Sequence, residues 1–292
     1  MVPSSLLKLN NLILLLALVS LLLGRAWQHL FWDAPFRTLL WNEELLKFFV
    51  EKFTTLSWHQ YVTSEKVDQG IQNLIKIFGS FYFFGAFASY FAVKKKIWAL
   101  NYIFVTGLGL VFLGLLSWAE KFFYFGMLFE HSIQMATPFI FYLFFLKDPW
   151  ITPRTDQKML LILKVSIALT FIGHGLFAIG FYPVPGHFID MLINVFGCSE
   201  KSAKTFLMIM GTIDIISSIG LFIRPIRIFS LWFMIGWGAI TAMARITAHL
   251  DFQLLAFTGN QWVYEMMVRL PHALIPLFLL FKLREENTKA ST

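Results

Sequence analysis

Eight long apolar runs constrain this chain more than any other feature of its sequence. A helix needs roughly 20 apolar residues to cross a bilayer core about 30 Å thick, and each run is close to that length. Of the 292 residues, 58% are hydrophobic and only 14% are charged, so the chain has too few polar residues to cover such helices in water. The sequence therefore predicts an all-α, polytopic transmembrane helical bundle of about eight spans in the lipid bilayer. The runs cover residues 6–24, 71–93, 97–117, 122–146, 159–181, 204–223, 228–248 and 263–282.

Basic residues in the connections predict how these spans are oriented. In membrane proteins such residues concentrate in the short cytoplasmic connections. With the N-terminus inside, the short connections on that side are basic, whereas the longer ones opposite (25–70, 182–203 and 249–262) mix both charges. We therefore expect both termini in the cytoplasm. We attribute the net charge of +7 to basic residues that flank the spans, and we expect no nucleic-acid partner. The basic positions are Lys94, Lys95, Lys96, Lys147, Arg154, Lys158, Arg224 and Arg227.

Two smaller features narrow the possibilities further. Lys8 and the first apolar run are similar to the start of a signal peptide, but no small-x-small cleavage site follows, so we expect a retained first span. Cys198 is the only cysteine, which excludes an intramolecular disulfide and a CxxC redox pair. If the protein moves electrons, a bound cofactor must carry them.

The spans divide into two halves that align with each other. We expect an N-terminal module at 1–150, a C-terminal module at 151–283, and a short polar tail at 284–292. Four spans in each half give two repeats of the same orientation, related by an axis along the membrane normal. The aligned pairs are Gly24 with Gly173, Arg25 with His174, Gly79 with Gly211, Tyr82 with Asp214, His131 with Arg269, Gln134 with His272, and Pro138 with Pro276.

Two connections on the outer side are predicted to be interfacial helices and not simple loops. Segment 25–70 contains four tryptophans among apolar and acidic residues, and segment 186–203 has a similar amphipathic pattern. Tryptophan-rich amphipathic segments lie at the membrane interface, where the indole ring is half buried. We expect both segments to lie flat over the outer face as caps.

Ionisable residues within the spans mark the candidate site, because a charge in hydrocarbon is costly and each such residue is a functional candidate by default. Several of them fall at a similar depth in the outer half of their spans. Glu265, Arg269 and His272 share one face of the last helix, and of the adjacent Glu130 and His131 we expect His131 to face the pocket. The sequence predicts an outward-facing ligand pocket formed by His131, His174, Asp214, Arg245, Glu265, Arg269 and His272.

Structural explanations of the same residues remain open. Asp214 and Arg245 could form a buried ion pair that fixes helix register, and Glu265 and Arg269 are one turn apart and could pair with each other. We expect the single histidines His59, His187 and His249 to be interfacial. No zinc-type HExxH, phosphate loop or nucleophile elbow is present, so the sequence assigns no metal site and no catalytic residue.

One half of the chain carries a recognisable order of motifs. Residues 167–180, IALTFIGHGLFAIG, end an apolar run near a His-Gly pair, and a break leads to the amphipathic PGHFIDML at 185–192. The next span contains GTIDII with Asp214, and a basic turn, RPIR, follows at 224–227. Over 159–282 this order resembles the DoxX family of membrane proteins, whereas the first half departs from it at Arg25 and Tyr82. The resemblance implies the bacterial inner membrane and a membrane or periplasmic oxidoreductase, or a quinol-linked enzyme, as partner.

Four functions remain in competition at this point. The first is an accessory membrane subunit whose pocket holds a lipid-soluble ligand such as a quinone. The second is a haem-containing redox protein, with ligands among His131, His174 and His272. The third is a small-molecule transporter, against which the predicted spans show no glycine-rich break. The fourth is an envelope scaffold whose buried charges only hold helices together. Whether the protein is an enzyme, and whether it forms a homo-oligomer, the sequence leaves open.

Overall fold

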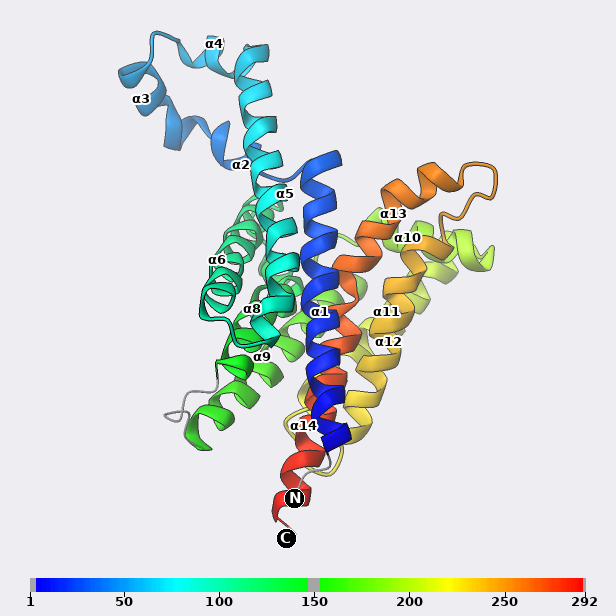
Figure 1. The fold of residues 1–292 in the computed structure, drawn as a ribbon. Coiled ribbons are helices and arrows are strands. Elements are labelled where there is room, and N and C mark those ends of the chain that lie inside the picture. The colour runs from blue at the N-terminus through cyan, green and yellow to red at the C-terminus, as the bar shows by residue number, and fades with distance from the viewer. Residues whose placement is uncertain (1–3, 147–152, 291–292) are drawn as a thin grey trace.

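The computed structural model describes residues 4–146 and 153–290, with side chains from 8–146 and 157–285 (Figure 1). All regular secondary structure in these ranges is helical, and Figure 1 shows it as a bundle with α1 near its centre. The helices are α1 (Ser4–Phe31), α2 (Arg37–Leu40), α3 (Glu43–Phe53), α4 (Trp58–Thr63), α5 (Glu65–Val93), α6 (Ile97–Glu120), α7 (Phe125–Glu130), α8 (Ser132–Phe145), α9 (Pro153–Ala178), α10 (Gly186–Phe196), α11 (Glu200–Gly220), α12 (Arg227–Thr247), α13 (Leu255–Arg269) and α14 (Pro271–Ala290).

The prediction of an all-α transmembrane bundle is confirmed. In the part of the chain that the structure describes, seven helical segments are long and apolar enough to cross a membrane. They are α1, α5, α6, α9, α11, α12 and the pair α13–α14, which together form one span. The remaining predicted span, 122–146, is divided into the shorter helices α7 and α8. The protein is therefore an integral membrane protein.

Two of the predicted spans are interrupted. Helix α7 ends at Glu130 and α8 begins at Ser132, while α13 ends at Arg269 and α14 begins at Pro271. At the first break the backbone N–H of Ile133 donates to Oγ1 of Thr170 on α9, at 3.0 Å, and not to a carbonyl of its own helix. At the second, the missing N–H of Pro271 removes one helical hydrogen bond. The sequence shows no glycine-rich break in these spans, and both interruptions form without one, at His131 and before Pro271.

The two halves pack through contacts that occur in pairs. A Cβ added to Gly24 on α1 would lie 2.9 Å from the carbonyl oxygen of Tyr264 on α13. A Cβ added to Gly173 on α9 would lie 2.7 Å from the carbonyl oxygen of Gly126 on α7. The alignment that matches Gly24 with Gly173 and Pro138 with Pro276 also matches Tyr264 with Gly126. In each case the first span of one half packs against the last span of the other half. This is the packing expected of two repeats that are related by an axis along the membrane normal.

The two predicted caps differ in how they lie against the bundle. The first span continues to Phe31, so the beginning of segment 25–70 belongs to α1. Helices α2, α3 and α4 project from the upper left of the bundle in Figure 1, and α3 exposes Phe48, Phe49 and Phe53. Helix α10, by contrast, lies against α11 and α12. The prediction that 25–70 caps the outer face was wrong, because these residues form a projection instead.

The two ends of the chain lie at the same end of the bundle, opposite α3, α4 and α10 (Figure 1). This is the arrangement expected of an even number of crossings. Lys147 and the predicted boundary between the modules at 150 and 151 lie outside the described residues. The side chain of Arg154 and those of the tail from residue 286 onward lie outside them as well.

Candidate functional site

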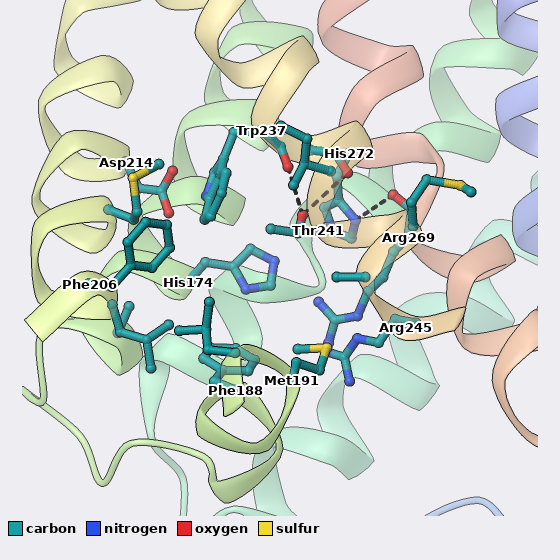
Figure 2. A pocket seen from close by; sticks show the side chains of 18 of the residues that line it. His174, Phe188, Met191, Phe206, Asp214, Trp237, Thr241, Arg245, Arg269 and His272 are labelled. Atoms are coloured by element: carbon teal, nitrogen blue, oxygen red, sulfur yellow. Dashed lines mark hydrogen bonds between the residues drawn. The ribbon is translucent and has the colours of Figure 1, made fainter. Parts of the chain in front are cut away.

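An apolar chamber of about 440 Å³ lies in the second half of the protein, among helices α9 to α14. Its walls are mainly aromatic and aliphatic, with Phe171, Phe188, Met191, Leu207 and Trp237 among the lining residues (Figure 2). Ile240 and Met243 on α12 also line it and are 60% and 48% exposed on the outside of the bundle. Because α12 is a membrane span, this rim faces lipid, and the chamber can receive a molecule from the bilayer.

A second, polar chamber of about 300 Å³ lies between the two halves. Helices α1, α7 and α8 of the first half contribute to it, as do α9, α10, α12 and α13 of the second. Its polar and charged lining residues are Arg25, Gln28, Glu130, His131, Gln134, His174, His187, Arg245, Tyr264, Glu265 and Arg269.

Three residues line both chambers and form the boundary between them. They are His174 on α9, Arg245 on α12 and Arg269 at the end of α13. Figure 2 shows the side chains of Arg245 and Arg269 next to each other, close to Met191, with His174 beside them. Arg245 is 3% exposed, and its Nη1 donates to Oε2 of Glu265 at 3.0 Å. The boundary therefore carries charge within the hydrophobic interior.

His174 is held between the two halves. Its Nδ1 lies 2.7 Å from Oε1 of Glu130 on α7, which is the only side-chain ion pair between the halves among the described residues. Its ring meets the ring of His272 edge to face, with centroids 5.3 Å apart. Nδ1 of His272 is 2.8 Å from the carbonyl oxygen of Arg269, which the interruption of α13 leaves without a helical partner. This Nδ1 is the donor, and Nε2 of His272 has no hydrogen-bond partner among the described residues.

Asp214 lies at the other side of the apolar chamber from the two arginines, beside Trp237 and Phe206 (Figure 2). It is 3% exposed, and its Oδ1 has no hydrogen-bond partner in the described part of the chain. The predicted ion pair of Asp214 with Arg245 is not formed, since Arg245 pairs with Glu265. Trp237 donates a hydrogen bond to the carboxyl group of Asp214. Because a buried oxygen without a partner is costly, Oδ1 is a candidate for contact with a bound molecule.

In the first half, larger side chains occupy the space that corresponds to the apolar chamber. His29 and Tyr82 are completely buried there, with ring centroids 5.2 Å apart. A Cβ on Gly79 would meet His29, and a Cβ on the matching Gly211 would meet Ala178, so Ala178 takes the place of His29. Asp214 takes the place of Tyr82 in the same alignment. In the second half a methyl group and a carboxylate thus stand where the first half has two bulky rings. The chamber occupies the volume that these rings would fill.

All seven residues predicted for the site line one or both chambers. His174, Arg245 and Arg269 line both, Asp214 and His272 line the apolar chamber, and His131 and Glu265 line the polar one. The predicted Glu265–Arg269 pair is not formed, because the carboxylate reaches across to α12.

The choice of His131 over Glu130 was incomplete. Adjacent residues of a continuous helix point about 100° apart, but the chain turns at His131, so both side chains line the polar chamber. Glu130 makes the contact with His174.

Several further lining residues were missed by the sequence prediction, among them Arg25 and His187. Arg25 donates to Gln28 and Gln134, and the alignment of Arg25 with His174 was the signal that could have placed it in the site. The hydrogen bond between Arg25 and Gln134 in the first half lies at the aligned positions of the ring contact between His174 and His272 in the second. His187 on α10 reaches the polar chamber and was predicted to be merely interfacial. Desolvation, followed by the charges of Arg245 and Arg269, lowers the pKa of His187 to about 3, so its ring is neutral at ordinary pH.

Comparison of the chain with family models, with curated proteins and with solved structures gives no match. The resemblance of 159–282 to DoxX proteins therefore stays a prediction. The function is argued from the two chambers and the residues between them.

Proposed function

We propose that this membrane protein binds a lipid-soluble ligand, which enters the apolar chamber from the bilayer and places a polar group against His174, Arg245 and Arg269. The observation that carries the proposal is that these three residues line both chambers. A molecule that fits both has an apolar body and a polar end. Such mostly apolar cavities with a few convergent polar groups are the usual form of small-molecule sites.

The size of the apolar chamber supports a ligand rather than a packing defect. A volume of about 440 Å³ lies within the range of about 300–1,000 Å³ typical of small-molecule sites. It is larger than the voids that a well-packed interior tolerates. An accessory subunit of an oxidoreductase in the bacterial inner membrane, with a quinone as the ligand, is the form of this function that the DoxX resemblance favours.

The first half supplies the variant that tests the proposal. Ala178→His combined with Asp214→Tyr places in the second half the two side chains that close the equivalent space in the first. We expect the purified variant to lose a lipid-soluble molecule that the unaltered protein retains in mild detergent, as detected by mass spectrometry of the extract. Ile216→Tyr is the matched control, because Ile216 on α11 is exposed and lines neither chamber. Only bulk lipid in both extracts would contradict the proposal.

A transporter is the second candidate, and the two interrupted spans favour it. Broken helices at corresponding positions of two repeats, next to a central site, are a recurrent feature of secondary transporters. The breaks at His131 and after Arg269 are at corresponding positions, and both border the polar chamber. Uptake of a polar solute into proteoliposomes that Arg245→Gln abolishes would favour transport. Ligand retention without uptake would favour the binding protein.

A further inference from the structure

The charges at the boundary between the chambers indicate what kind of polar group the ligand carries. This inference rests on the proposed function and concerns the same site. The guanidinium groups of Arg245 and Arg269 lie next to each other at the inner end of the apolar chamber (Figure 2). Two like charges this close in an apolar interior repel each other unless an anion lies between or beside them.

The carboxylates of the site make their direct contacts with Arg245 and His174, and none of them pairs directly with Arg269. Glu265 pairs with Arg245, and Glu130 lies against His174. In the part of the chain that the structure describes, Arg269 has no carboxylate within ion-pair distance, and the buried Nε of Arg245 has no hydrogen-bond partner. Asp214 is separated from both arginines, on the far side of Trp237 (Figure 2). One guanidinium group and one N–H donor are thus free to bind a further acceptor.

Guanidinium groups have a strong preference among acceptors. Their planar array of N–H donors matches the paired oxygens of a carboxylate or a phosphate, and charge-assisted bonds of this kind are roughly twice as strong as neutral ones. A neutral carbonyl, such as that of a quinone, would accept a hydrogen bond but would bring no negative charge to the two adjacent guanidinium groups. An anion satisfies both requirements.

The walls of the apolar chamber determine the rest of the ligand. Besides the arginines, the lining includes Met191, Phe188 and Trp237, and it includes Ile240 and Met243 at the lipid-facing rim. A molecule bound at Arg245 and Arg269 must therefore place an apolar body in this chamber. We infer that the ligand is an amphiphile with a single anionic head, a carboxylate or a phosphate, which Arg245 and Arg269 bind while its apolar part fills the chamber.

Native mass spectrometry of the full-length protein in an uncharged detergent tests the inference. The probes are oleate, a single-chain lysophosphatidate, methyl oleate as the neutral match of oleate, and a short-chain quinone. We expect the two anions to bind at least about 10-fold more tightly than methyl oleate, which is the effect of about 1.4 kcal/mol from one charge-assisted bond. Comparing oleate with lysophosphatidate shows whether a carboxylate or a phosphate is preferred.

Variants of the arginines complete the experiment. We expect Arg269→Gln to weaken the binding of both anions by about 10-fold and to leave methyl oleate unchanged, and Arg269→Lys to recover part of the loss. Arg224→Gln is the control, because Arg224 lies in the turn between α11 and α12 and lines neither chamber. Equal binding of oleate and methyl oleate would overturn the inference, and so would tight quinone binding that is insensitive to Arg269→Gln, although the proposed function would then survive. If no probe binds to the unaltered protein, both fail.

Discussion

Glu265 on α13 accepts a hydrogen bond from Nη1 of Arg245 on α12 at 3.0 Å, although Arg269 is its neighbour one turn along the same helix. The Arg245 side chain is 4% exposed and that of Glu265 is 29% exposed. The pair therefore connects two spans across the boundary of the polar chamber, with its cation inside and its anion near the opening. It neutralises one of the two arginines that face the ligand site.

The first prediction concerns this pair. Glu265→Gln removes the only carboxylate that Arg245 contacts in the described structure, and leaves a buried cation with a weaker, neutral acceptor. Breaking a fully buried pair costs about 3–5 kcal/mol, and since Glu265 is partly exposed we expect a loss of roughly 1–2 kcal/mol in unfolding free energy. Thermal unfolding in detergent measures it.

The control for this experiment is the exposed pair of Lys47 and Glu43 on α3. Glu43→Gln should change stability by less than about 0.5 kcal/mol, because surface pairs contribute little. If Glu265→Gln has as small an effect as Glu43→Gln, the pair does not hold α12 against α13.

Replacing Arg245 and Glu265 together by Met and Leu should be near neutral for stability but should abolish ligand binding. This result would distinguish a functional site from charges that only hold helices together.

The second prediction concerns the interruption of the fourth span. Thr170 on α9 is completely buried, and its hydroxyl accepts the N–H of Ile133 directly after the break. Thr170→Val keeps the shape and removes the acceptor, so a buried N–H is left unsatisfied. We expect a loss of about 1–3 kcal/mol, measured by thermal unfolding, and recovery in Thr170→Ser, which restores the hydroxyl. Equal stability of the valine and serine variants would show that the hydrogen bond does not hold the break.

The sequence predicted the spans and the gathering of the charged residues better than it predicted their partners. An apolar run of the right length is a property of a single helix, and seven of the eight predicted runs form candidate spans in the described structure. The predicted ionisable residues gather around the two chambers. Which carboxylate meets which arginine depends on how helices rotate against each other. Glu265 pairs with Arg245 on another helix and not with Arg269 on its own, and the spacing of residues along one helix could not predict this choice.

The apolar chamber itself could not be predicted from either half alone. It exists because Ala178 and Asp214 are smaller than the His29 and Tyr82 that fill the matching space. The sequence alignment contained the pair of Tyr82 with Asp214, but the difference in volume becomes a cavity only when the neighbouring helices do not collapse into it. The projection formed by α2 to α4 was missed for a related reason, since an amphipathic pattern does not specify which surface it covers.

The third prediction concerns haem. Nδ1 of His131 and Nδ1 of His272 each lie within hydrogen-bond distance of a carbonyl of their own chain segment, at 2.9 and 2.8 Å, so only Nε2 of each ring could bind iron. The rings of His174 and His272 touch edge to face, whereas two imidazoles on one haem iron lie on opposite sides of it. We expect the oxidised-minus-reduced optical spectrum of the purified protein to show no Soret shift. A shift that disappears in His174→Ala would refute this and identify a redox carrier.

The last prediction uses the paired glycines of α1 and α9. A Cβ at Gly173 would lie 2.7 Å from two backbone atoms of α7, which cannot move without displacing the helix, so Gly173→Ala should cost about 1–3 kcal/mol of unfolding free energy. Gly24 approaches α13 in the same way, at 2.9 Å from a carbonyl oxygen, and Gly24→Ala should cost a similar amount if the halves are repeats. Gly236 on α12 has nothing within 4 Å of an added Cβ, so Gly236→Ala should instead stabilise the helix by about 0.5–1 kcal/mol. Thermal unfolding of the three variants decides between the alternatives. A loss at Gly173 without one at Gly24 would mean that the second half alone depends on close packing, and that the repeat does not extend to the interface between the halves.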